Sequence, residues 1–214
     1  MDADQLIDRR RLRRKLSFWR AAAIIVVLAV IGVAIYAAAP DGRGGDHIAR
    51  IEINGMITDD SKLVDLIEHA QEADNVKAIV VSVSTPGGTT YGGEQLRKAL
   101  VEARQTKPVV ADVRTLAASA GYMIAASTDH IVAGETSIVG SIGVIFQYPQ
   151  VGELMDKIGV QMNEIKSSPL KAEPSPFHPA TPEAEEMIRS MVLDSYDWFV
   201  DLVAEERGMD RARA

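Results

Sequence analysis

The sequence predicts an α/β domain with a mainly parallel sheet and flanking helices, preceded by one transmembrane helix. Three observations lead to this prediction. An uncharged apolar run follows a basic N-terminus. Beyond it, β-rich segments alternate with segments of helical periodicity, which is typical of parallel sheets with helical crossovers. The composition, 47% apolar and 25% charged over 214 residues, is ordinary for a globular chain.

Composition also excludes several classes of protein. The chain has no cysteine, which excludes a disulfide-stapled miniprotein and any cysteine-ligated metal site. Its formal net charge of −7 disfavours a non-specific nucleic-acid binder, because such proteins need a basic face.

The N-terminal part is predicted to be a membrane anchor. Residues 1–20 carry a charge of +4, and residues 21–39 carry none. A helix of that length, at ~1.5 Å per residue, roughly spans the ~30 Å hydrocarbon layer. The basic cluster places residues 1–20 in the cytoplasm and exports residues 47–214, with 40–46 as a glycine-rich linker.

The apolar run has two other interpretations. A buried core helix is disfavoured by nineteen uncharged residues after a basic cluster. A cleavable signal peptide is the stronger rival, because the alanines at 37–39 offer a small-residue cleavage site. The run is longer than the usual signal core of about 7–15 residues, which favours an uncleaved anchor.

The first half of the exported part shows three alternating strand and helix patterns. Ile48, Ile51 and Ile53 lie in a predicted strand at 47–57, and an apolar helical face at 61–73 follows. The same reasoning predicts further strands at 77–83 and 108–113, and helices at 92–104 and 120–127.

The second half is less regular. Strands are predicted at 130–133, 137–145 and 160–165, and a short helix at 154–158. Residues 167–182 hold five prolines and are predicted to be irregular. A long amphipathic helix then starts at Pro182, with Thr181 as its cap and Gly208 at its end.

Several common catalytic and cofactor motifs are missing. The glycines near residue 90 are not followed by Gly-Lys-Ser/Thr, and no Gly-x-Gly-x-x-Gly is present. The four histidines have no zinc-protease spacing. No metal and no cofactor is therefore expected.

Two small-residue segments remain as candidate chemistry. Residues 84–88 follow a buried strand, at the sheet edge where ligands of α/β proteins collect. Glycines there let a substrate approach backbone N–H groups. Residues 117–122 run from a strand into a buried helix, and place the Ser119 hydroxyl at the helix N-terminus. Tight turns and helix caps explain both segments equally well.

Four motifs give these segments a family resemblance. They are TPGG at 85–88, ASAGY at 118–122, GSIGV at 140–144, and IKS at 165–167 followed by Lys171. Together with the anchor, they resemble signal peptide peptidase A, the membrane-bound serine proteases of the crotonase/Clp-like fold, over residues 46–214.

The resemblance assigns a role to each matching residue. It implies that Ser119 is the nucleophile and Lys171 the general base. It gives the N–H groups of Gly88 and Ser119 to an oxyanion hole, and it makes Ser141 the residue that orients the lysine amine. Lys166 also matches a family position and is the alternative base.

A lysine base makes physical demands. Lysine accepts a proton only when neutral, and its free pKa of ~10.4 must be lowered by desolvation. We therefore expect a pocket of small apolar side chains around Lys171 and an activity that rises toward alkaline pH.

The resemblance also implies partners. It predicts peptide substrates, above all signal peptides left in the membrane, contact with the lipid bilayer and no nucleic acid. In short members of the family, serine and lysine come from neighbouring subunits of a ring, so a homo-oligomer is expected.

Departures from the family pattern keep alternatives open. Ala120 replaces a frequent glycine, Pro169 precedes the lysine, and relatives continue past the position where this chain ends, which suggests a truncated chain. A catalytically silent, membrane-anchored scaffold of the same fold is the main alternative. An acyl-CoA enzyme of the crotonase type is a weaker one, because export separates it from cytoplasmic acyl-CoA.

Overall fold

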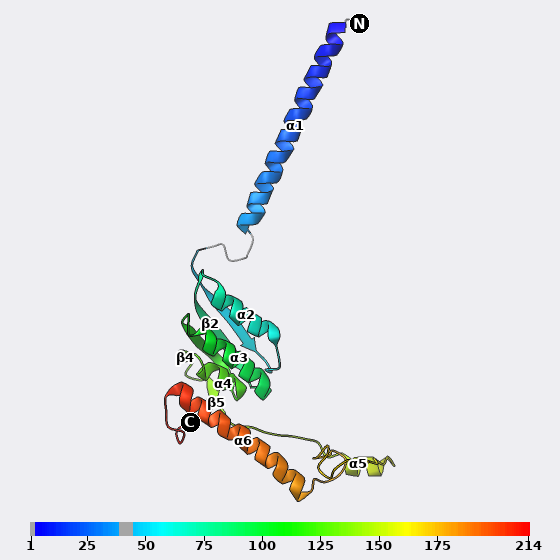
Figure 1. Ribbon diagram of the computed structural model, residues 1–214, viewed down its shortest axis with the longest axis vertical. Coiled ribbons are helices and arrows are strands. Elements are labelled where there is room, and N and C mark those ends of the chain that lie inside the picture. Colours follow the sequence, from blue (N-terminus) through cyan, green and yellow to red (C-terminus); the bar gives the residue numbers. More distant parts are fainter. Residues whose placement is uncertain (1–2, 39–44) are drawn as a thin grey trace. The chain divides into compact units, whose positions relative to one another are not determined.

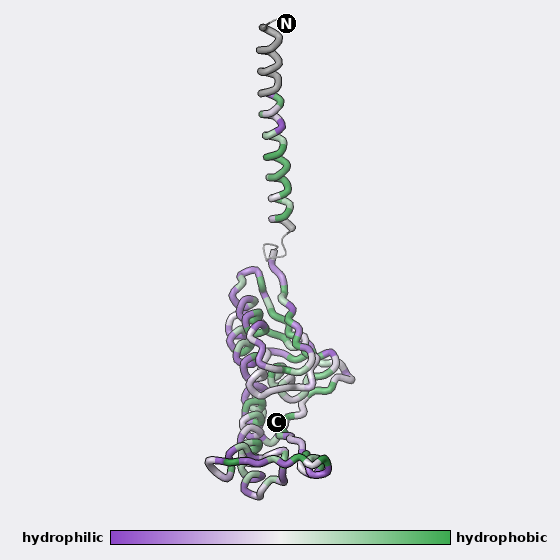
Figure 2. Tube along the Cα trace, turned by 90° about the vertical axis from the view of Figure 1, so that its right-hand side faces the viewer, coloured by the Kyte–Doolittle hydropathy of each residue, from purple (hydrophilic) through white to green (hydrophobic). Residues whose placement is uncertain are grey.

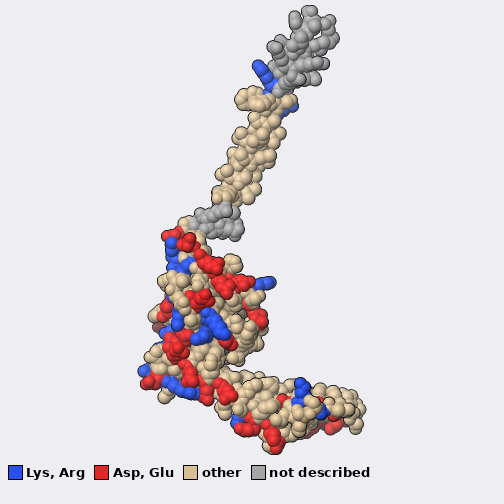
Figure 3. Space-filling model, in the orientation of Figure 1, with Lys and Arg blue, Asp and Glu red and all other residues tan. Residues whose placement is uncertain are grey.

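A computed structural model describes residues 3–38 and 45–214, with side chains described for 15–36 and 45–214. The chain forms two compact units, residues 1–45 and 46–214. The first unit is the helix α1, Ala3–Ala38. Its stretch Lys15–Tyr36 is long and apolar enough to cross a membrane, and Figure 2 shows it as mostly hydrophobic. Charged side chains are confined to its N-terminal part (Figure 3). Ala39 and most of the expected linker lie outside the described residues.

The second unit is built on a parallel sheet, as predicted. Its strands are β1 (His47–Asn54), β2 (Val76–Thr85), β3 (Val109–Ala118), β4 (His130–Ala133) and β5 (Ile138–Gly140). The order is β1-β2-β3-β4, and β5 pairs with the last residues of β3, beyond the part that pairs with β4. Every pairing is parallel, so the carboxyl ends of β2 and β3 meet at one edge.

Helices α2 (Ser61–Glu72), α3 (Thr90–Ala103) and α4 (Ala120–Ala126) cover the sheet (Figure 1). Polar caps start the first two: Asp60 accepts a hydrogen bond from the Lys62 N–H, and Thr89 accepts one from the Gly92 N–H. The core lies between β1–β3 and these helices. Its most deeply buried side chains include Ile67, Ile79, Val81, Leu100 and Ile124.

Helix α6 (Pro182–Arg207) begins and ends at the predicted residues. Thr181 accepts a hydrogen bond from the Ala184 N–H, and Gly208 closes the helix with a left-handed φ of 58°. Its C-terminal half packs on α4 through Phe199, Leu202 and Val203. The face expected to be apolar throughout is buried only there, because Met187 and Met191 near the other end are exposed.

An ion-pair group attaches α6 to α3. The Glu206 carboxylate, whose side chain is 5% exposed, pairs with Arg97 at 2.9 Å and with Arg104 at 2.7 Å. A buried carboxylate needs such partners, because desolvation without them is costly. The two arginines therefore fix the C-terminal half of α6 beside the sheet.

Residues 141–181, which we call the arm, leave the sheet after β5 and return at α6 (Figure 1). The arm carries the short helix α5, Gly152–Lys157. Residues 144–146, Tyr148 and Pro174 share a cavity with side chains of α6. Away from the sheet, the arm thus lies along the N-terminal half of α6.

One predicted strand is shorter than expected in this part of the chain, and one is wrong. The strand predicted at 137–145 shortens to three residues, and residues 160–165 form none. A strand needs a neighbour for its N–H and C=O groups, and within the described residues none lies beside 160–165. The apolar pattern is real, but Ile165 and Ile158 are exposed rather than packed.

Candidate active site

Ser119 lies at the turn between β3 and α4 in a strained conformation. Its φ of 52° and ψ of −121° are unusual for a residue with a Cβ, and such strain clusters at functional sites. Two glycines permit the close packing around it. A Cβ on Gly121 would lie 2.4 Å from Thr85 Cγ2, and one on Gly87 would lie 2.8 Å from Ser119 Cβ. The turn thus presents a half-buried hydroxyl at the carboxyl edge of the sheet.

Gly88 and Ser141 line the same cavity as Ser119. All three line a cavity of about 640 Å³, together with Met56, Val144 and Ile145. Gly88 and Ser119 also line a smaller cavity of about 90 Å³, whose walls include Met123, Trp198 and Phe199 beside the polar Thr90 and Ser195. Three of the four predicted site residues are therefore brought together by β2, β3 and the end of β5.

Gly88 is held by backbone pairing with Ile57. The Ile57 N–H donates to the Gly87 oxygen, and the Thr89 N–H donates to the Ile57 oxygen, both at 2.9 Å. In the described part of the chain, the Gly88 N–H itself has no hydrogen-bond partner. It therefore meets the first requirement of an oxyanion-hole donor, a fixed and unoccupied N–H.

The second expected donor is not available in this structure. The Ser119 N–H donates to the Gly140 oxygen at 2.9 Å, as part of the pairing that holds β5 beside β3. The next N–H along the chain belongs to Ala120, which lines the smaller cavity. Among the residues described, no acceptor contacts it. The expectation for Ser119 is thus corrected: its own amide holds the turn together.

Lys171 is not beside Ser119 within one chain. It lies in the arm, in a turn closed by a hydrogen bond from its N–H to the Ser168 oxygen at 3.1 Å. Its side chain is exposed and lines neither cavity that contains Ser119. The apolar pocket expected around this lysine is therefore not formed by one chain. Nor does Ser141 orient the lysine amine here.

Lys166 has a different environment. Its Nζ lies 2.6 Å from Glu164 Oε2 and 2.6 Å from Glu173 Oε1. Hydrogen bonds to Glu164 and Glu173 raise the pKa of Lys166 above its usual 10.5. A lysine held in its charged form cannot accept a proton, which disfavours Lys166 as the general base.

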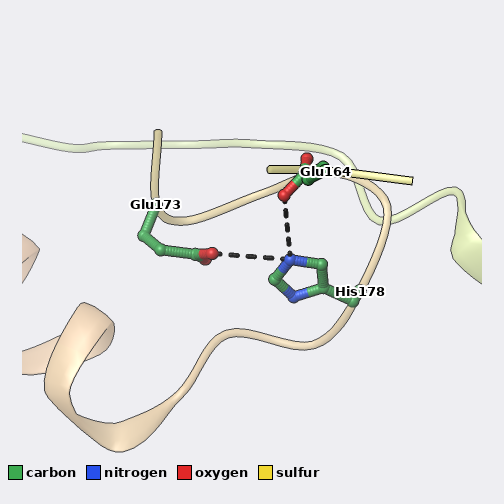
Figure 4. A group of neighbouring side chains, drawn as sticks. All are labelled: Glu164, Glu173 and His178. Carbon is green, nitrogen blue, oxygen red and sulfur yellow. Dashed lines mark ion pairs between the residues drawn. The ribbon is translucent and has the colours of Figure 1, made fainter. Parts of the chain in front are cut away.

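Sequence reasoning missed the group around this lysine. Glu164, Glu173 and His178 bring their ligand atoms within 4.8 Å of one another (Figure 4). His178 Nε2 lies 3.4 Å from Glu173 Oε1. The positive charge between the carboxylates is supplied by Lys166, so the cluster is satisfied without a metal. Residues so far apart in a proline-rich segment carry no periodic signal.

This cluster predicts that the local stability of the arm does not change with pH over a wide range. Lys166 lowers the pKa of Glu173 below 4.5, so the pair stabilises the arm fully above pH 4.5 and is lost as pH falls through the lowered value. The raised pKa of Lys166 keeps its contribution full below pH 10.5. We expect hydrogen exchange over residues 164–178, corrected for intrinsic rates, to be constant from about pH 5 to 10. His178→Gln is the control, because it removes the imidazole that lies 3.4 Å from Glu173 Oε1; opening of the arm between pH 5 and 10 in that variant would contradict the expectation.

Known proteins with similar sequences include several named as proteases. Residues 102–214 match the model of Peptidase family S49. A protein of Methanocaldococcus jannaschii named as a protease is 33% identical over 201 residues, which cover 87% of this chain and 63% of the relative. A protein of Enterococcus faecium named as a signal peptide peptidase SppA is 31% identical over 184 residues, covering 79% of this chain and 54% of the relative. The chain thus spans less than two thirds of either relative.

A solved structure shares the fold. A membrane-bound stomatin-specific protease, solved as a mutant in complex with a substrate peptide, superposes with a TM-score of 0.51 at 20% identity. The match covers 79% of this chain and 64% of that chain. The shared region includes an α/β core of the kind described here.

Proposed function

Because the chain belongs to peptidase family S49, we propose that it is a membrane-anchored serine endopeptidase with Ser119 as nucleophile and Lys171 as general base. The observation that carries the proposal is the strained Ser119 turn, which shares a cavity with the free N–H of Gly88. Apolar helix α1 supports membrane anchoring. The basic residues before the span favour a cytoplasmic N-terminus.

The proposed dyad is completed between two copies of the chain. Lys171 lies in the arm and lines neither cavity that contains Ser119 of the same chain. The arm also exposes large apolar side chains, among them Ile145, Ile158 and Ile165. Exposed apolar patches mark interaction sites, and a neighbouring copy would bury them while bringing in a lysine. Burial there would also desolvate the Lys171 amine, as a lysine base requires.

The proposed reaction is acyl transfer to Ser119 followed by hydrolysis. Ser119 Oγ attacks the scissile carbonyl carbon while its proton moves to the Lys171 amine. The N–H groups of Gly88 and Ala120 hold the resulting oxyanion. The protonated lysine gives its proton to the leaving amine, and an acyl-enzyme remains. Lys171 then takes a proton from water, whose oxygen attacks the acyl carbon. The bond to Ser119 Oγ breaks, the lysine returns the proton to that oxygen, and the peptide acid leaves.

We propose short apolar peptides as substrates, including signal peptides left in the membrane. The cavity beside Ser119 is small, about 90 Å³, and its walls include Met123, Trp198 and Phe199. Such a cavity accepts a small or aliphatic side chain and excludes a charged one, whose desolvation would not be compensated. A membrane anchor places this site beside peptides released from the bilayer.

A serine-directed fluorophosphonate tests the proposal on the full-length chain in detergent micelles. We expect an adduct at Ser119, located by peptide mapping, that forms faster at pH 9 than at pH 7 because more of the lysine is neutral. Ser119→Ala removes the adduct, whereas Ser61→Ala, at an exposed helix start, leaves it. The absence of any adduct on folded wild-type chain would overturn the proposal in favour of the scaffold.

A further inference from the structure

The loop that carries Lys171 is closed at its two ends by one ion pair. Lys166 stands at its start and Glu173 at its end, with 2.6 Å between Nζ and Oε1. A second 2.6 Å pair joins Lys166 to Glu164. We call these two ion pairs the Lys166 clamp.

The clamp is a built feature rather than a chance surface contact. The side chain of Glu173 is 4% exposed and that of Lys166 is 20% exposed. The second carboxylate oxygen of Glu173 accepts the Ser175 N–H at 3.0 Å, and Ser175 is itself buried. A carboxylate so enclosed needs a cation, because burying its charge alone is strongly unfavourable.

The chain inside the loop is bent to a defined shape. Ala172, directly after Lys171, has a φ of 63°, a conformation that alanine adopts only where its surroundings impose it. The Glu173 N–H donates to the Leu170 oxygen at 3.3 Å, which closes the same turn. Within the described residues, the Lys171 amine has no partner, whereas the Lys166 amine has two carboxylates.

We propose that Lys166 and Glu173 are positioning residues that hold the loop so that the Lys171 amine is aimed at the nucleophile. This inference rests on the proposed function for the role of Lys171. The division of labour between the two lysines follows from their partners: one is tied and charged, and the other is free to take a proton. The contacts that form this loop all lie within one chain.

The proposal predicts a catalytic defect in a domain whose sheet stays folded. Lys166→Ala and Glu173→Gln should lower the labelling rate of Ser119 and kcat by about 10- to 100-fold with little change in KM, because misplacing a catalytic group by about 1 Å costs that much. Lys166→Arg should restore most of the rate, since a guanidinium pairs with both carboxylates but cannot act as a base. If Lys166 were the base, Lys166→Arg would be as inactive as Lys166→Ala.

A double variant shows whether the clamp acts through Lys171. Adding Lys166→Ala to Lys171→Ala should cause no further loss, because a misplaced loop no longer matters once the base is gone. Lys157→Ala is the matched control, since it removes an exposed lysine from α5 of the same arm and should keep the wild-type rate. Independent losses that add would overturn the proposal.

Hydrogen exchange separates this inference from the proposed function. On the full-length chain, Lys166→Ala and Glu173→Gln should increase deuterium uptake over residues 167–172 and leave strand β2 unchanged, whether or not the protein is active. Increased uptake with an inactive wild type would reject the protease proposal while keeping the clamp. Unchanged uptake in both variants would reject the clamp even if Ser119 is labelled.

Discussion

Ser119→Ala and Lys171→Ala chains, each inactive alone, should recover activity when they are mixed. Each single change removes a member of the dyad and should lower kcat/KM by about 10⁴- to 10⁶-fold, as expected for nucleophile and base. In the proposed assembly, the serine of one copy meets the lysine of another. The single variants therefore complement each other wherever a Lys171→Ala chain supplies the serine.

The fraction of activity that should return follows from the number of intact serine–lysine pairs. With random mixing of equal amounts, about a quarter of the serine–lysine pairs contain two intact members, so about a quarter of wild-type activity should return. The chains are co-expressed, or dissociated in detergent and reassembled, and peptide hydrolysis is measured. A dyad within one chain predicts no recovery at any ratio.

A second mixture gives the control. Wild-type chain mixed with equal amounts of the double variant Ser119→Ala/Lys171→Ala should retain about a quarter of full activity if the dyad joins two copies, and about half if it does not. Both mixtures use the same total protein, so the comparison is independent of expression level. Half activity in this mixture, together with no recovery in the first, would refute the shared site.

Gly88→Ala should be the most damaging substitution at the cavity that leaves every polar side chain in place. A Cβ there would lie 1.9 Å from the Ile57 oxygen and 2.6 Å from its carbon and nitrogen. These atoms are fixed by the two 2.9 Å hydrogen bonds that join Ile57 to residues 87 and 89. The strand end must therefore move, and the Gly88 N–H moves with it.

Two effects should follow from Gly88→Ala. Loss of one oxyanion donor lowers kcat by about 10²- to 10³-fold, with kcat/KM falling equally. The overpacking lowers the free energy of unfolding by about 1–3 kcal/mol. Gly143→Ala is the matched control: it lines the same cavities, but its added Cβ meets nothing within 4 Å. We expect that control to change stability by about 0.5 kcal/mol or less, and equal effects of the two variants would contradict the geometry.

The sheet and its helices follow from the sequence because local pattern and tertiary packing agree there. The run at 77–83 is mostly apolar, and the structure buries one face of β2 and half-buries the other. The cap at Thr181 and the glycine at 208 set the bounds of α6, since their interactions are local. The turn at Ser119 is also set by local sequence, because the small residues Ala118, Ala120 and Gly121 lie next to Ser119 in the chain.

The structure of the arm could not be predicted from the sequence, because the groups that its residues pair with are distant in the chain or absent from it. Residues 160–165 have the apolar pattern of a strand but no neighbour to pair with. The occupied Ser119 amide depends on the position of Gly140, which no spacing rule provides. The clamp joins Lys166 to Glu164 and Glu173 through side chains alone, so it leaves no trace in periodicity.

The position of Lys171 on a projecting arm has a consequence for regulation in the cell. If nucleophile and base meet only between copies, as proposed, a single chain is inactive, and its activation is an encounter between two membrane-anchored copies. Confinement to two dimensions raises the effective concentration of partners, so sparse chains stay silent while crowded ones switch on together. The hydrolytic rate would then rise more steeply than the number of chains, and membrane copy number would set the threshold for proteolysis.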